Sequence, residues 1–253
     1  MASSITIAAI VFVCVFGSAL LGTLLRSLVP IDHLTADSKD TVKVATGLIG
    51  TMAALVLGLL TASAKSTFDT LDSEITQNAA HIVLLDRVLA QYGPETKETR
   101  DLIRQAVVYR LKLTWPEEAS PVQIDVPETA QSLEAIQAHL NALSPQNDTQ
   151  RALRSRAISI SGDIAGSRWL VLAQVADAIP TPFLIVMVLW LMVLFTSFGL
   201  LAPRNATVMA ALALCALSVA GSIFLILEMS RPLEGVIKVS SAPLRYALSQ
   251  LGK

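Results

Sequence analysis

The sequence has few charged residues. Only 15% of its 253 residues are Asp, Glu, Lys or Arg, and 53% are hydrophobic, whereas soluble domains are about 25% charged. The mean hydropathy is accordingly positive, at +0.59. The 19 basic and 20 acidic side chains nearly cancel and form no basic block, which argues against a nucleic-acid partner. We therefore expect an integral membrane protein, with the lipid bilayer as its first partner.

The sequence also lacks the residue patterns of redox, metal and catalytic sites. Two cysteines are too few for a disulfide framework. The three histidines lie in separate segments with no Cys or carboxylate at ligand spacing, and no Gly-rich phosphate loop or nucleophile motif occurs. We expect no catalytic residue, no metal site and no cofactor, and no enzymatic activity.

Four hydrophobic runs contain no charged residue and no His. They are residues 5–25, 44–64, 183–201 and 206–227, and each is long enough to cross a bilayer, which takes roughly 20 residues. Because coupled pumps carry ionisable groups inside the membrane, such a pump is not expected. Four crossings place both termini on one side, and a slight excess of Lys and Arg there favours the cytoplasm. We expect a multi-pass protein of the cell (inner) membrane.

The region between the second and third runs has helical periodicity and no strand pattern. An apolar seam with alternating steps of three and four residues predicts a coiled-coil-like helix. Its members are Phe68, Leu71, Ile75, Asn78, Ile82, Leu85, Leu89 and Tyr92. No helix breaker precedes Gly93 and Pro94, so one helix is predicted from residue 44 to residue 92. Further helices are expected at about 95–115, at about 128–143 and from Asn147 and Asp148 onward, the last one antiparallel to the seam.

These patterns together predict an all-α fold. It is a four-helix transmembrane protein with a helical cytoplasmic domain inserted between the second and third membrane helices. The expected divisions are 1–64 for the first two membrane helices, 65–182 for the cytoplasmic domain, 183–227 for the last two membrane helices and 228–253 for a short cytoplasmic tail. Asn78 lies on the apolar seam, where it either fixes the register through a polar partner or is rotated toward water.

The second membrane helix carries a face of small and weakly polar residues. We call this face the small-residue stripe, and its members are Gly47, Thr51, Ala54, Gly58, Thr61 and Lys65. Small residues let membrane helices approach closely, so the stripe can be a packing face. Alternatively, copies of it surround a narrow pore, with Lys65 near the mouth favouring anions. Where the fourth helix ends, Glu228, Arg231 and Glu234 form an interfacial charge cluster, either as an ion pair or as solvated charges.

Three parts of the sequence resemble the prokaryotic bestrophin-like family of membrane proteins. They are the run that begins GLIGTMAALVLGLLTASAKSTFDTL, the run from PFLIVMVLW to LEMSRPLEG, and the final SSAPLRYAL. The most specific parts are the hairpin GLLAPRNAT and the helix exit LEMSRPLEG. The resemblance covers nearly the whole chain. It implies a distant likeness to true bestrophins, which are pentameric anion channels with a pore lined by the second membrane helix. The acidic calcium-binding cluster of animal bestrophins and their aromatic pore neck have no counterpart here, so calcium gating is not implied.

Two functions of different classes follow. The first is a homo-oligomeric channel for small anions, with a pentamer implied by the resemblance and the second membrane helix lining the pore. The alternative is a non-conducting membrane scaffold or sensor whose helical stalk binds a protein partner. The channel requires the small-residue stripe to face water in the assembly, whereas the scaffold requires the stripe to be packed dry.

Overall fold

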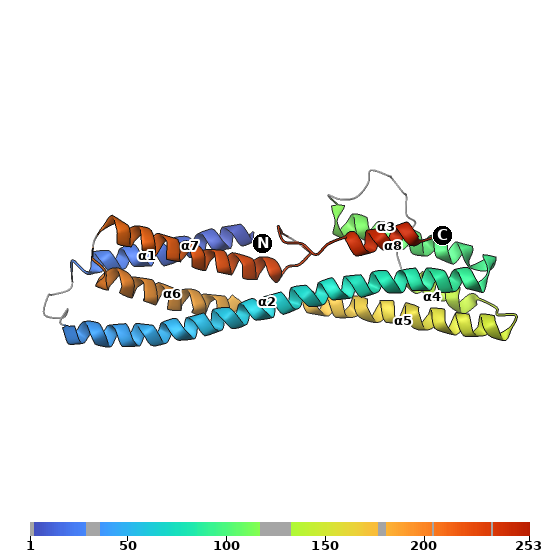
Figure 1. Ribbon diagram of the computed structural model, residues 1–253, viewed down its shortest axis with the longest axis horizontal. Coiled ribbons are helices and arrows are strands. Elements are labelled where there is room, and N and C mark those ends of the chain that lie inside the picture. The colour runs from blue at the N-terminus through green and yellow to red at the C-terminus, as the bar shows by residue number, and fades with distance from the viewer. Residues whose placement is uncertain (1–2, 29–35, 117–132, 177–180, 204, 234) are drawn as a thin grey trace. The chain divides into compact units, whose positions relative to one another are not determined.

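The computed structural model describes residues 3–28, 36–116, 133–176, 181–203, 205–233 and 235–253 (Figure 1). Within these ranges every regular element is a helix. The chain forms two compact units. The membrane unit comprises Met1–Phe68 and Asp177–Lys238, and the helical unit comprises Asp69–Ala176 and Val239–Lys253. The last 15 residues of the chain therefore belong to the same unit as its middle region.

The membrane unit contains the four predicted membrane helices. They are α1 (Ser4–Leu25), the first part of α2 (Ala36–Tyr92), α6 (Thr181–Leu201) and α7 (Ala206–Met229). All four are long and apolar enough to cross a bilayer. Two of them begin at a polar N-cap, because the Ser3 hydroxyl accepts from the Thr6 amide and the Asn205 side chain accepts from the Val208 amide. The predicted membrane-helix content is confirmed.

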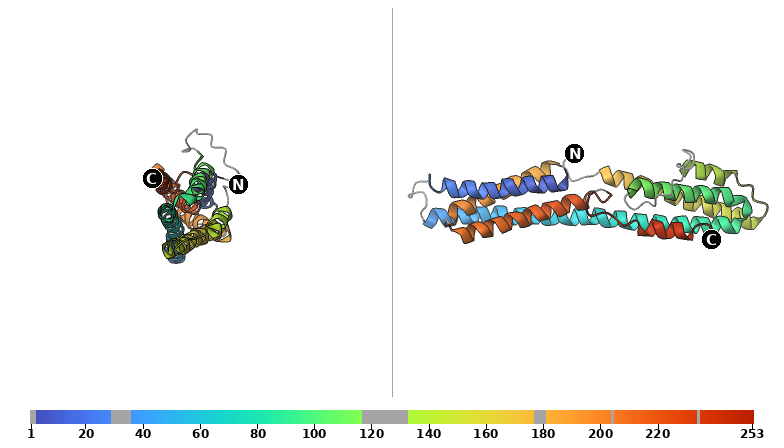
Figure 2. Two further views of the ribbon diagram at one scale, coloured as in Figure 1. Left: turned by 90° about the vertical axis from the view of Figure 1, so that its right-hand side faces the viewer. Right: turned by 90° about the horizontal axis from the view of Figure 1, so that it is seen from above.

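Helices α1 and α6 cross at a point where their backbones touch. A methyl group built on Gly22 would overlap the backbone carbonyl of Thr196, and one built on Gly199 would overlap the carbonyl of Ala19. Both glycines are therefore required for this approach, which is how small residues bring membrane helices together. Helix α7 also packs against α1, beside which it runs (Figure 2). The shared core includes Val15 at 0% exposure and Met187 at 1%.

The seam predicted on the second half of α2 is the core of the helical unit. Seven of its eight members, from Leu71 to Tyr92, are buried, with exposures between 0% and 7%. Helix α2 is continuous over 57 residues, about 85 Å at 1.5 Å per residue. It ends at Gly93, whose φ of +146° suits glycine, and the Thr96 hydroxyl donates to the freed carbonyl of Leu89 at 2.6 Å. The end of the helix was predicted correctly, whereas the helix begins at Ala36 rather than at the predicted residue 44.

Four more helices complete the helical unit. They are α3 (Lys97–Thr114), α4 (Leu133–Ala142), α5 (Asp148–Ala176) and α8 (Ala242–Gln250). The expected antiparallel partner is α5, which runs beside α2 in Figures 1 and 2, and the Gln150 amide donates to the Tyr92 carbonyl at 3.0 Å. Helix α4 was expected to begin near residue 128, but residues 117–132 lie outside the described ranges. Helix α8 packs on α3 and was not predicted.

Asn78 is buried on the seam. Its exposure is 2%, so the alternative in which it turns toward water is wrong. Within the described part of the chain, neither side-chain atom of its amide has a hydrogen-bond partner, and the buried hydroxyl of Ser161 on α5 also has none. A buried amide without partners destabilises the fold relative to an apolar side chain of the same size.

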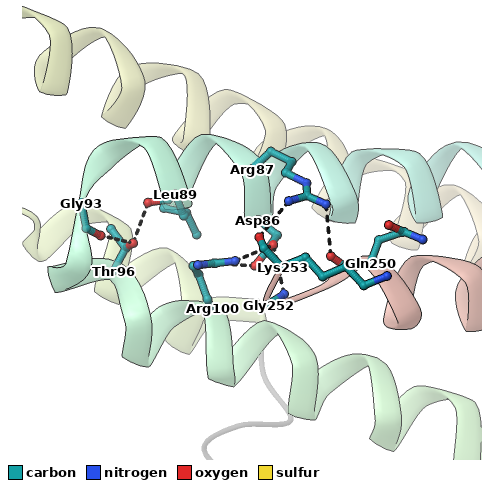
Figure 3. Close-up of polar contacts among 9 residues, drawn as sticks. All are labelled: Asp86, Arg87, Leu89, Gly93, Thr96, Arg100, Gln250, Gly252 and Lys253. Atoms are coloured by element: carbon teal, nitrogen blue, oxygen red, sulfur yellow. Dashed lines mark hydrogen bonds and ion pairs between the residues drawn. The ribbon is translucent and has the colours of Figure 1, made fainter.

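A buried ion pair joins three helices of this unit (Figure 3). Asp86 on α2 is 1% exposed and accepts from Nε and Nη2 of Arg100 on α3, at 2.7 and 2.9 Å. The same carboxylate accepts from the Gly252 amide at 3.3 Å, and Arg87 donates to the Lys253 carbonyl at 2.8 Å. The hydrogen bond to Asp86 raises the pKa of Arg100, while burial opposes the increase. The end of α8 is thus fixed through its backbone.

Candidate functional site

The small-residue stripe lies on the surface of the chain. Each of its six members, Gly47, Thr51, Ala54, Gly58, Thr61 and Lys65, is exposed. A Cβ atom added at Gly47 or at Gly58 would meet nothing within 4 Å. Among the described residues of a single chain, therefore, no other helix packs against the stripe at Gly47 or Gly58.

The membrane part of α2 has three distinct faces. Successive residues are about 100° apart around a helix. The face toward α6 and the core includes Ala53, at 4% exposure, and Gly50, whose added Cβ would lie 3.7 Å from the Leu194 side chain. A second face exposes Leu55 at 72% and Leu59 at 67%. The small-residue stripe lies between these two, roughly a third of a turn from each.

The exposure of α2 separates it from the other membrane helices. Only 11% of its most apolar stretch is buried in the chain, against 28% for α1, 33% for α6 and 28% for α7. A membrane helix with so little contact in its own subunit has two outward surfaces of different chemistry. The large apolar face is suited to lipid or to a neighbouring subunit, whereas the small-residue stripe is suited to close packing or to water.

The hydroxyl groups of the stripe are used by the helix itself. Thr51 donates to the carbonyl of Leu48 and Thr61 donates to that of Leu57, both at 2.8 Å. Each hydroxyl therefore presents oxygen lone pairs and a methyl group to the outside, with its hydrogen already engaged. Consequently, the lining that this face can offer is weakly polar.

The charged residues of the stripe lie at the end of the membrane segment. Lys65 follows the last apolar turn, and Asp69 and Asp72 come four and seven residues later on the same side of α2. Asp72 is about 10 Å beyond Lys65 along the axis, comparable to the distance over which salt screens a charge. Asp69 is only about 6 Å beyond Lys65 along the axis, so the nearest positive charge to the apolar segment is opposed by a negative charge one turn away.

The interfacial charge cluster contains a buried carboxylate. Glu228 is 3% exposed, and its Oε2 atom accepts from the amides of Val236 and Ile237, at 2.5 and 3.2 Å. Arg231 is partly exposed, and Glu234 lies outside the described residues. No local sequence signal indicates the two backbone partners, because they come from the turn that follows α7.

The described residues contain no group of three or more His, Cys, Asp or Glu that could hold a metal ion. His81 and His139 lie on α2 and α4, and His33 lies outside the described residues. Cys14 is partly buried, and Cys215 is exposed on α7. We therefore take the small-residue stripe as the candidate site.

A family comparison decides the classification of this chain. A model of the Bestrophin-like domain matches residues 12–244. The chain belongs to the Bestrophin-like family. No protein of established annotation matches this bestrophin-like sequence.

Solved structures share the fold of this bestrophin-like protein. One mutant of a bacterial bestrophin homologue from Klebsiella pneumoniae has a TM-score of 0.61 at 12% identity and covers 99% of this chain and 97% of its own. A second mutant of that homologue has a TM-score of 0.55 at 14% identity, covering 92% and 96%. A structure described as a membrane protein gives 0.55 at 13%, covering 92% and 95%. The all-α prediction and the family resemblance are both confirmed.

Proposed function

We propose that this bestrophin-like protein assembles with copies of itself around an ion pathway lined by the small-residue stripe of α2, and that the pathway conducts small anions. The assembly is a pentamer in the form that the family resemblance implies. The protein crosses the cell (inner) membrane four times, with its termini and helical unit on the cytoplasmic side, the side that the slight excess of Lys and Arg favours.

The main support for this proposal is that the whole stripe faces outward from the chain. All six residues are exposed on a helix that is the least buried of the four spans. The side chains of the stripe are small, because up to its last member it consists of glycine, alanine and threonine. The last member, Lys65, carries a positive charge. Close packing against a symmetry-related helix would use the same surface, so an experiment must distinguish water from protein at these positions.

The proposed anion preference rests on Lys65. It is exposed at the edge of the apolar segment, where a charge changes the local concentration of ions in a way that salt screens. The acidic residues Asp69 and Asp72 lie further along the same face and oppose it. A moderate preference that depends on the charge at position 65 is therefore expected, rather than strict selectivity.

Thiol labelling of single cysteines tests the lining. In a Cys14→Ser, Cys215→Ser background, one cysteine is placed at a time on each face of α2. Gly58 and Thr61 represent the stripe, Leu55 and Leu59 the exposed apolar face, and Ala53 the buried face. The oligomeric protein in lipid vesicles is treated with a small, charged, water-soluble thiol reagent, and the rate of modification is measured.

We expect rapid reaction at positions 58 and 61 and slow reaction at the other three. Leu55 and Leu59 are matched controls because, like Gly58 and Thr61, they are exposed in one chain, yet are expected to meet lipid or protein. Equal protection of all five positions would contradict the channel and favour the scaffold. Equal reactivity at positions 55, 58, 59 and 61 would show that α2 is surrounded by water without a lining face.

A further inference from the structure

The turn that follows α7 is folded back onto the end of that helix. Glu228, in the last turn of α7, accepts from the amides of Val236 and Ile237. Gly235 has a φ of +87°, and a Cβ there would overlap the Glu228 carboxylate. Only glycine therefore allows the chain to return this closely. We call the described residues 229–233 and 235–237 the Glu228 turn.

The Glu228 turn is held at the level of the membrane-helix ends. The start of α1 adjoins the end of α7 (Figure 1), and Ser4, the first residue of α1, is buried and forms a side-chain hydrogen bond with Glu228. Both helices are apolar up to this point. Because the Val236 amide is within hydrogen-bond distance of Glu228, the turn stays at the edge of the apolar segment rather than extending away from it.

At this level the turn exposes an apolar side chain. Val236 is 72% exposed, although its own amide is engaged by a carboxylate that is only 3% exposed. The first turns of α1 and α6, at the same end of the unit, expose Ile5 at 60% and Phe183 at 58%. Val236 thus extends the outward apolar surface of the membrane helices by one residue beyond the end of α7. Arg231 and Lys238 flank it in sequence, as basic residues flank membrane-embedded segments.

We propose that the Glu228 turn is an interfacial membrane anchor that places Val236 among the lipids, at the boundary between headgroups and acyl chains. Lipid is the occupant that continuity with the exposed surfaces of α1, α6 and α7 favours. The buried carboxylate fixes the conformation of the turn, and the apolar side chain fixes its depth. The anchor sets the position at which the chain leaves the membrane and does not depend on ion conduction.

A spin-label measurement tests the depth of Val236. In the Cys14→Ser, Cys215→Ser background, single cysteines replace Val236, Leu214 and Tyr246 and carry a nitroxide label. Leu214 in α7 and Tyr246 on α8 are matched controls, since their exposures are 64% and 68%. The full-length protein is placed in vesicles of phosphatidylcholine and phosphatidylglycerol. Collision rates with oxygen, which concentrates in lipid, and with a water-soluble nickel complex are then measured.

The proposal expects an oxygen-to-nickel collision ratio at position 236 several-fold higher than at 246 and approaching that at 214. A ratio equal to that at position 246 would place Val236 in water and overturn the anchor. Low collision rates with both reagents would place it against protein, such as a second copy, and would also overturn it. Adding Glu228→Ala should lower the ratio at 236 and leave that at 214 unchanged, whereas an unaltered ratio at 236 would contradict the role of the carboxylate.

Discussion

The buried carboxylate of Asp86 gives the sharpest stability prediction for the helical unit. Its side chain is 1% exposed and that of Arg100 is 20% exposed. Replacing Asp86 by alanine removes the acceptor of two guanidinium hydrogen bonds and of the Gly252 amide. Breaking a buried ion pair from one side costs about 3–5 kcal/mol, because the remaining charge is buried without a partner. Since Arg100 retains some contact with water, we expect about 3 kcal/mol.

The effect should be measured on the full-length protein in detergent or lipid. A loss of this size corresponds to a decrease in melting temperature on the order of 10 °C for a unit of this length. Protease resistance is followed as the temperature rises, and the fragments show which unit is cut. We expect early cleavage in the helical unit, including α8, because Asp86 helps to hold the Gly252 backbone.

The exposed ion pair between Asp148 and Arg151 provides the matched control. Its side chains are 93% and 68% exposed, so solvent screens their attraction and Asp148→Ala should leave the melting temperature almost unchanged. Asp86→Asn, which keeps the shape but loses the charge, should give an intermediate decrease. If Asp86→Ala shifts the transition no further than Asp148→Ala does, the buried pair does not stabilise the unit as argued here.

Two further changes test the packing of each unit. Gly22→Ala should destabilise the membrane unit by about 1–3 kcal/mol, because the added methyl meets the Thr196 carbonyl. Gly17→Ala is the control and should be tolerated, because nothing lies within 4 Å of a Cβ added there. Equal thermal stability of the two variants in lipid would contradict the close crossing of α1 and α6. Asn78→Leu should leave the melting temperature unchanged or raise it, because both amide atoms are buried without partners. A clear loss of stability in this variant would instead support a polar partner that fixes the register.

The elements with strong periodicity could be predicted from the sequence. The four membrane helices are determined by local hydropathy, and the seam from Leu71 to Tyr92 by alternating steps of three and four residues. Both signals are contained within one helix. The end of α2 was also readable, because Gly93 and Pro94 act on the backbone of their own segment.

The features that depend on distant segments could not be predicted. Asp86 and Gly252 are 166 residues apart, and nothing in their local sequence indicates that they meet. Helix α8 has only nine residues, so its periodicity is weak, and its burial follows from contact with α3. The backbone partners of Glu228 likewise become evident only when the turn at Gly235 is seen. On α2, the spacing indicated which residues share a face, but only the packing of α6 shows which of its faces points outward.

Whether the stripe on α2 lines an ion pathway can be tested by measuring the reversal potential of the purified oligomer in a planar bilayer with a salt gradient. An anion pathway predicts a protein-dependent current whose reversal potential lies close to the equilibrium potential of the anion. Lys65→Glu should move it toward the cation side, and the shift should be smaller at high salt because the charge is screened. Absence of current from a folded, correctly inserted oligomer would contradict the claim, as would a current whose selectivity ignores the charge at position 65.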